Sequence, residues 1–167
     1  MSVAAVIVMG VSGCGKSTVG PLLAVRLGWP FEDGDAFHPA ANVAKMSTGT
    51  PLTDDDRWPW LAAIAARIAK ARADGSGVVI GCSALKRTYR DALRDGHSDV
   101  RFVHLAGSLG LIAARQAARR HHFMPASLMA SQFATLEPPD DEPDAVTIPV
   151  EHAPEALAEA AFRALGR

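Results

Sequence analysis

The sequence has few of the features that mark membrane, secreted or zinc-stapled proteins. Its two cysteines, Cys14 and Cys82, are too few for a disulfide framework and lack the spacing of metal ligands, which suits a reducing compartment. No apolar run approaches the ~20 residues that a membrane-spanning helix requires. No basic leader or small-residue cleavage site marks the first residues for export. We therefore expect a cytoplasmic protein with no membrane partner.

The chain also lacks an excess of charge of either sign. It has 17 lysines and arginines against 18 aspartates and glutamates, and its formal net charge is −1. Proteins that bind nucleic acid through its phosphates usually carry a marked basic excess, so no nucleic-acid partner is expected. A length of 167 residues, of which 49% are hydrophobic, suits one domain with its own core, which we place at 1–167.

Short β-branched runs alternate along the chain with longer segments of helical period. This alternation is typical of a parallel sheet whose strands are joined by crossover helices, so we predict an α/β fold with a five-stranded parallel sheet. Strands are predicted over 4–9, 30–33, 78–82, 100–105 and 145–150. Helices are predicted over 16–27, 40–47, 54–73, 86–95, 109–119, 126–135 and 154–165. The acidic, proline-rich segment 137–144 is interpreted as a solvated connection.

The segment GVSGCGKS at 10–17 matches the phosphate-loop pattern G-x-x-x-x-G-K-[ST] and lies between a predicted strand and a predicted helix. Its glycines let successive N–H groups point at phosphate oxygens, and the helix start adds partial positive charge. Lys16 is expected to reach the β- and γ-phosphates of ATP, and Ser17 to offer a hydroxyl to Mg²⁺. The predicted nucleotide-binding residues here are Gly10, Ser12, Gly13, Cys14, Gly15, Lys16, Ser17 and Thr18.

Two signatures of other nucleotide-binding proteins are missing. The chain has no N-K-x-D motif, which reads guanine in GTPases. The run GVVIGCSALKR at 77–87 has no carboxylate at the end of its strand, where motor and transporter ATPases generally carry an acidic pair. The carboxylate that completes a magnesium site must therefore come from another strand.

The segment FEDGDAFHP at 31–39 supplies such carboxylates at the end of the second predicted strand. Ligands of parallel sheets bind outside the carboxyl ends of the strands, so Asp33 and Asp35 are expected to face the phosphate loop. One can hold Mg²⁺ through water while the other accepts a proton from an attacking hydroxyl. We assign Asp33 to catalysis and metal binding, and Asp35 and His38 to the acceptor substrate, with Asp35 as the alternative base. A helix cap or turn is the competing interpretation.

Four blocks of the sequence together resemble the bacterial-type gluconate kinases, small phosphate-loop enzymes related in fold to adenylate and shikimate kinases. The blocks are MGVSGCGKST, DGDAFHPAANVAKMSTGTPLTDDDRWPWL, CSALKRTYRDALR and HFMPASLMASQFATLE. The resemblance implies a three-layer P-loop kinase fold with a small helical lid at about 111–125. It also implies transfer of the γ-phosphoryl group of ATP to the 6-hydroxyl of D-gluconate. Another small-molecule kinase, or a module that only binds nucleotide, remains the alternative.

Several basic residues fit an anionic sugar acid. Arg57 is a candidate clamp for its carboxylate, because a guanidinium can bind two oxygens at once; a surface ion pair with Asp54 or Asp55 is the alternative. Lys86 and Arg90 are four residues apart and so share a helix face. The resemblance favours substrate binding by Ser83, Lys86 and Arg90 over a solvated basic face.

The predicted lid carries further cations. Arg115 and Arg119 lie one helical turn apart, where their repulsion is relieved by an anionic partner. The resemblance implies that both bind ATP and that Arg119 stabilises the transferring phosphoryl group; a solvated basic face is the alternative. It also places His122 and Gln132 near the substrate. Related kinases are often dimers, but no stripe in the sequence identifies an interface, so a homodimer stays an open alternative.

Overall fold

The computed structural model describes residues 2–118 and 126–166. Its strands are β1 (Ala5–Met9), β2 (Phe31–Asp33), β3 (Val78–Gly81), β4 (Val100–Ala106) and β5 (Ala145–Pro149). Its helices are α1 (Lys16–Leu27), α2 (Ala40–Ser47), α3 (Asp54–Asp74), α4 (Arg87–Arg94), α5 (Leu109–Ala118), α6 (Ala126–Thr135) and α7 (Pro154–Ala164), with a 3₁₀ turn η1 (Gly34–Phe37) after β2. The predicted elements are all present, and their described ends lie within one residue of the predicted ones.

The strands form one parallel sheet in the order β2-β3-β1-β4-β5, which confirms the predicted α/β class. β1 lies at the centre and all five of its residues are buried, as its apolar sequence predicts for a strand covered on both faces. The strand order reverses at β1, since β2 and β3 lie on one side of it and β4 and β5 on the other. The carboxyl end of β1 is therefore the crevice where sheets of this kind bind ligands.

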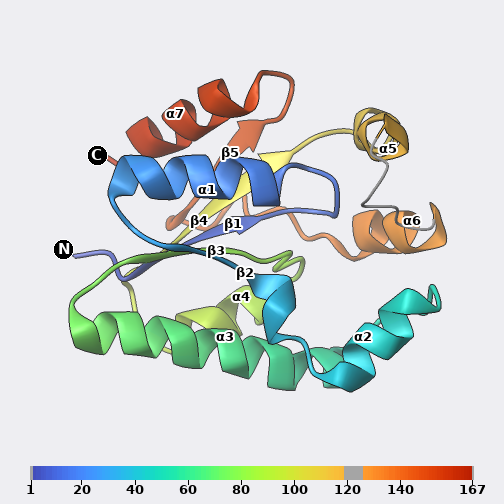
Figure 1. Cartoon of the computed structure of the whole chain (residues 1–167), viewed down its shortest axis with the longest axis horizontal. Coiled ribbons are helices and arrows are strands. Elements are labelled where there is room, and N and C mark those ends of the chain that lie inside the picture. The colour runs from blue at the N-terminus through green and yellow to red at the C-terminus, as the bar shows by residue number, and fades with distance from the viewer. Residues whose placement is uncertain (1, 119–125, 167) are drawn as a thin grey trace.

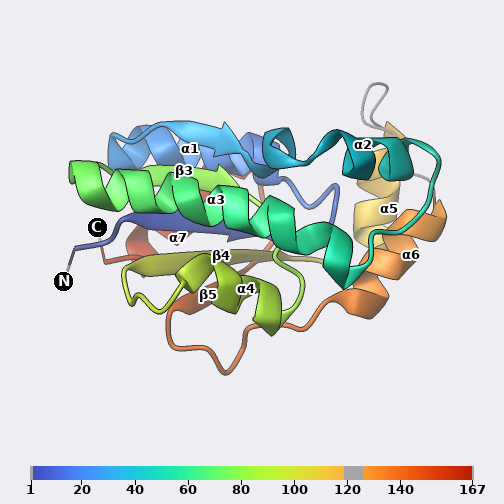
Figure 2. The same ribbon diagram turned by 90° about the horizontal axis from the view of Figure 1, so that it is seen from below.

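Helices cover both faces of the sheet, which gives the molecule three layers (Figure 1). α1 packs against α7 and β3 on one face, and α3 packs against α4 and β1 on the other. α2, α5 and α6 gather beyond the carboxyl ends of the strands in both views (Figure 2). Within residues 2–118 and 126–166, no helix has the length and apolarity needed to cross a membrane.

The acidic run at 54–56 forms the first turn of α3. The Thr53 side chain accepts a hydrogen bond from the Asp56 N–H, and the Asp56 carboxylate accepts one from the Thr53 N–H, which forms a capping box. Further along, the buried residues Leu61, Ile64 and Ile68 recur at helical spacing on the face that packs against the sheet.

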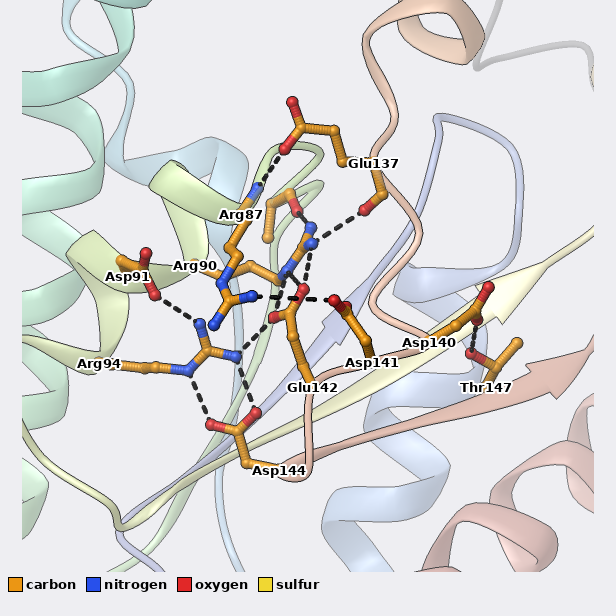
Figure 3. A network of polar contacts seen from close by, with 11 residues as sticks. Arg87, Arg90, Asp91, Arg94, Glu137, Asp140, Asp141, Glu142, Asp144 and Thr147 are labelled. Atoms are coloured by element: carbon orange, nitrogen blue, oxygen red, sulfur yellow. Dashed lines mark hydrogen bonds and ion pairs between the residues drawn. The ribbon is translucent and has the colours of Figure 1, made fainter.

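The segment 137–144 is only in part the solvated connection that its composition predicts, because most of its residues are exposed but Glu142 is buried (Figure 3). Glu142 is only 4% exposed and accepts hydrogen bonds from Arg90 Nη2 and Arg94 Nη2, both at 2.6 Å. Arg94 also pairs with Asp144. These contacts fasten the segment to α4 and leave only part of its acidic surface, including Asp141, in solvent.

The expectation that Arg90 binds substrate is wrong. Its side chain is buried, and its guanidinium donates to the Glu142 carboxylate, to the Ala84 carbonyl oxygen at 2.8 Å and to the Glu137 carbonyl oxygen at 2.9 Å. All three of its nitrogens are thus engaged inside the protein. The face of α4 that carries Arg90 turns toward the core, and the buried charge holds two loops together there.

Candidate active site

The phosphate loop has the backbone that its glycines predict. Gly10, Gly13 and Gly15 have φ values of 141°, 85° and 110°, in the region that side chains other than glycine avoid. A Cβ on Gly10 would lie 2.9 Å from the Leu105 carbonyl oxygen, so the close approach also demands glycine. Lys16 Nζ donates to the carbonyl oxygens of Gly10 and Val11 at 2.8 and 2.9 Å, which folds the ammonium group across the loop.

A cavity of about 210 Å³ lies in front of this loop. Its walls come from the loop itself, the ends of β2 and β3, the chain between η1 and α3, and helix α6. The cavity brings together these predicted site residues: Ser12, Gly13, Gly15, Lys16, Ser17, Asp33, Asp35, His38, Arg57, Ser83 and Gln132. The carboxylates of Asp33 and Asp35 and the ammonium group of Lys16 thus line the same cavity.

Asp33 ends β2 and also caps the turn that follows. Its Oδ1 accepts a hydrogen bond from the Asp35 N–H at 2.9 Å, so the competing interpretation as a cap is correct and is compatible with a place in the cavity. A Cβ on the intervening Gly34 would lie 2.3 Å from the Gly81 carbonyl oxygen. Only glycine therefore lets this turn pack against the end of β3 with both carboxylates turned toward the cavity.

The carboxyl group of Asp35 is harder to ionise than a free one. The protein around the cavity displaces bulk water and raises the pKa of Asp35, the Asp33 carboxylate raises it further, and Lys16 opposes both effects. The cavity is open, and 80% of the side chain stays accessible to solvent. A bound substrate would therefore complete the desolvation of this carboxyl group.

His38 is held rigidly at the cavity wall. Its ring stacks on the Trp60 ring with centroids 4.0 Å apart, and its side chain is 3% exposed. Burial, followed by the charge of Arg57, lowers the pKa of His38 to about 4. The Trp60 indole N–H in turn donates to the Gly34 carbonyl oxygen at 2.8 Å, which ties the ring pair to η1. His38 is therefore a neutral hydrogen-bonding group near pH 7.

Arg57 points into the cavity and is not in a surface ion pair with Asp54 or Asp55. Its Nη1 donates to the Leu52 carbonyl oxygen at 2.7 Å and to the Tyr89 hydroxyl at 3.1 Å. The Tyr89 hydroxyl donates to Asp54. Tyr89 thereby orients the guanidinium, a role for which the sequence gives no signal because the two residues lie 32 positions apart.

Lys86 does not lie on a shared helix face with Arg90, because α4 begins only at Arg87. Its Nζ donates to Asp54 at 3.1 Å, and it is not among the residues that line the cavity. The pairing with Asp54 raises the pKa of Lys86, and the Asp54 carboxylate balances the charge of the ammonium group. The expected direct contact with substrate is therefore not supported.

Gln132 reaches the phosphate loop from α6. Its Oε1 accepts a hydrogen bond from the Ser12 N–H at 2.6 Å, across 120 positions of sequence. This amide oxygen lies against a loop N–H group of the kind that binds phosphate oxygens. Gln132 is thus a contact of the loop as well as a lining residue of the cavity.

A second cavity of about 460 Å³ also borders the loop. It shares Gly13 and Gly15 with the first cavity and is lined by Thr18, Arg115 and the connection 151–154 between β5 and α7. Thr18 and Arg115, both predicted to bind ATP, line this cavity, whereas the connection 151–154 was not predicted. Its only sequence signal is its position at the carboxyl end of the last strand.

Three predicted residues need separate comment. Cys14 borders the second cavity, but its side chain is 1% exposed, so mainly its backbone is available to a phosphate. The other two, Arg119 and His122, lie outside the described residues.

The oxygen groups around Lys16 fit a magnesium ion. Ser17 and Asp33 line the same cavity, and a hydroxyl with one carboxylate is what Mg²⁺ uses when substrate phosphates and water complete its shell. In the described parts of the chain, no cluster of three or more His, Cys, Asp or Glu residues could hold a metal ion.

Comparison with known proteins agrees with this geometry. A family model described as an AAA domain matches residues 6–139. A gluconokinase of Gluconobacter oxydans (strain 621H) is 51% identical over 157 residues, which covers 94% of this chain and 88% of the relative. The solved structure of a gluconokinase from Sinorhizobium meliloti 1021 is 48% identical, with a TM-score of 0.88 over 97% of this chain and 93% of that one.

A further solved structure, an unliganded sugar kinase from Janibacter sp. HTCC2649, has a TM-score of 0.93 and 45% identity over 98% of this chain and 95% of that one. These identities extend over nearly the whole of each chain. The site itself holds the phosphate loop together with Asp33 and Asp35 in one cavity. The chain therefore belongs to the gluconokinase family of phosphate-loop kinases.

Proposed function

We propose that the protein transfers the γ-phosphoryl group of ATP to the 6-hydroxyl of D-gluconate and releases 6-phospho-D-gluconate and ADP. The observation that carries the proposal is the shared cavity, in which Asp33, Asp35 and Arg57 face Lys16. The relatives named as gluconokinases support the choice of acceptor. A small-molecule kinase must hold an alcohol next to a triphosphate. This cavity has carboxylates and Arg57 for the alcohol and Lys16 for the triphosphate.

The acceptor is a polyol with a carboxylate at one end. Arg57 would bind the carboxylate, because its guanidinium is fixed by Leu52 and Tyr89 and Arg–carboxylate pairs are strong and directional. Asp35, His38 and Ser83 would bind hydroxyl groups along the chain. The length of the polyol would then place its far hydroxyl toward Asp33 and the phosphate loop.

Asp33 would take the proton of the 6-hydroxyl as the oxygen forms its bond to the γ-phosphorus and the bond to the ADP oxygen breaks. Lys16 would leave the carbonyl oxygens of Gly10 and Val11 and pair with phosphate oxygens. Arg119, which belongs to the predicted lid, would balance the negative charge of the transferring phosphoryl group. Ser17 and, through water, Asp33 would hold Mg²⁺, which spreads the charge of the phosphates when bound. Asp35 stays the alternative base.

The nucleoside end of ATP would occupy the second cavity, since the phosphate loop borders both cavities. Arg115 would contact it there, together with the connection 151–154. The two substrates would then meet across the phosphate loop.

ADP release measured with and without gluconate tests the function. We expect release in the presence of Mg²⁺ to depend on gluconate, to fail with shikimate or nucleoside monophosphates, and to give a product whose ³¹P–¹H coupling places the phosphate on carbon 6. Release at the same rate without acceptor would indicate a different activity. Tight ATP binding with no product from any sugar acid would favour a binding module.

Replacing Tyr89 with phenylalanine tests the role of Arg57. Loss of the hydroxyl leaves the guanidinium free to turn, so KM for gluconate should rise by about three- to tenfold, while kcat and KM for ATP stay within about twofold. A matched control is Trp58→Phe, because Trp58 packs edge-on against the same ring but its indole, which only donates, cannot hydrogen-bond the Arg57 guanidinium. An unchanged KM for gluconate in Tyr89→Phe would show that Arg57 does not need this orientation.

A further inference from the structure

Asn42 lies behind His38 and makes two hydrogen bonds with one atom. It is buried in the first turn of α2, and its Nδ2 lies 2.8 Å from the main-chain carbonyl oxygen of Asp56 and 3.1 Å from His38 Nδ1. A carbonyl oxygen can only accept. The Asn42 atom that faces Asp56 is therefore the amide nitrogen, and its second hydrogen points at His38 Nδ1.

This contact decides which ring nitrogen of His38 carries the proton. Nδ1 must accept the hydrogen bond from Asn42, so the neutral ring has its hydrogen on Nε2. A proton on Nδ1 would face the N–H of Asn42, and rotating the amide would bring its oxygen against the Asp56 carbonyl oxygen. Stacking on Trp60 keeps the ring in its plane.

The hydrogen on Nε2 faces the cavity on the side of Asp35. His38 Nε2 lies 4.0 Å from Asp35 Oδ1, which is too long for a direct hydrogen bond. A hydroxyl oxygen seated about 2.8 Å from each atom would bridge them. It would accept from the Nε2–H and donate its own hydrogen to the Asp35 carboxylate.

We propose that Asn42 is a positioning residue that holds His38 in the Nε2–H form, so that His38 and Asp35 together bind one hydroxyl group of the acceptor as donor and acceptor. The proposal rests on the function above for the identity of the acceptor. It makes His38 a hydrogen-bond donor to substrate and excludes it as the base in the transfer step.

The tautomer can be measured on the free protein, independently of any reaction. Long-range ¹H–¹⁵N spectra of uniformly labelled protein distinguish a protonated from an unprotonated ring nitrogen, and a His38→Gln variant identifies the His38 signals among the six histidines. We expect Nε2 to be protonated and Nδ1 unprotonated. A signal pattern with the hydrogen on Nδ1, or an equal mixture, overturns the proposal even if gluconate is the substrate.

Kinetics then test whether Asn42 acts through His38. Asn42→Leu should raise KM for gluconate about tenfold, leave KM for ATP within twofold, and give a mixed tautomer signal. In a His38→Gln background the same change should cost less than about twofold. Equal effects with and without His38 would reduce Asn42 to a packing role and overturn the proposal.

Lys45→Gln is the matched control, because Lys45 joins α2 to Asp56 through its side chain at 2.7 Å without touching His38. This variant should keep the tautomer and the KM for gluconate of the original protein. If Asn42→Leu does not fold, Asn42→Ala removes the same donor with a smaller side chain, and it should also give a mixed tautomer signal. A hydrogen that stays wholly on Nε2 in that variant would overturn the proposal. A protein that shows the expected tautomer but does not phosphorylate gluconate would contradict the proposed function alone.

Discussion

Replacing Asp33 with asparagine should lower kcat for gluconate phosphorylation by roughly 10²–10⁴-fold. Asparagine cannot take the proton of the attacking hydroxyl, and it is a weaker ligand for Mg²⁺. Its side-chain oxygen can still accept the hydrogen bond that Asp33 Oδ1 receives from the Asp35 N–H, so the turn after β2 should persist. Steady-state rates at saturating Mg²⁺, together with the thermal midpoint of unfolding, measure the two effects separately.

Asp35→Asn is the matched comparison, because both carboxylates line the same cavity. If Asp35 binds an acceptor hydroxyl, this variant should raise KM for gluconate about tenfold and reduce kcat far less than Asp33→Asn does. The opposite ranking of the two kcat values would assign the role of base to Asp35. Near-normal turnover in both folded variants would leave the transfer without a carboxylate base.

Replacing Glu142 with glutamine should destabilise the protein by about 3–5 kcal/mol, the usual cost of breaking a buried ion pair from one side. Arg90 is buried and would lose the carboxylate that pairs with it, whereas Arg94 would keep its pair with Asp144. Asp141→Asn is the control: this neighbour is 80% exposed and lies 3.9 Å from Arg87, so its free energy of unfolding should change by less than about 0.5 kcal/mol. Urea denaturation compares the three proteins.

The pH dependence gives the Glu142 prediction a second readout. Burial opposes ionisation of Glu142, but hydrogen bonds from Arg90 and Arg94 outweigh it and lower the pKa to about 2, from an ordinary value of 4.5. A depressed pKa in the folded state stabilises the protein above the unfolded value and loses this effect as the pH falls toward the folded value. The difference between the original protein and Glu142→Gln should therefore shrink as the pH falls from 4.5 toward 2. A constant difference would show that the charge is not what stabilises the segment.

Much of the fold could be predicted from sequence because its signals are local. Apolar runs bounded by glycine and proline mark the strands, and the pattern of residues 10–17 fixes the phosphate loop through the conformations that only glycine adopts easily. The position of Asp33 and Asp35 also follows from the rule that ligands of parallel sheets bind at the carboxyl ends of the strands, since both residues lie at that end of β2.

The parts that could not be predicted depend on partners that are distant in the sequence. The sequence suggests that Arg90 binds substrate. Only the fold shows that its guanidinium is hydrogen-bonded to Glu142, 52 positions away. A composition rich in acid and proline predicts a solvated segment, and only the packing of α4 shows that one of its carboxylates is buried. Tyr89 likewise gains its role from Arg57. The family resemblance does place Gln132 near the substrate, but its contact with the Ser12 N–H is seen only in the fold.

The position of the phosphate loop between two separate cavities has a kinetic consequence. If each substrate enters from its own side, neither blocks the entrance of the other, and both must be present before the phosphoryl group moves. Initial-rate plots at several fixed levels of the second substrate would then give intersecting lines, and the protein would pass through a ternary complex instead of a phosphorylated enzyme.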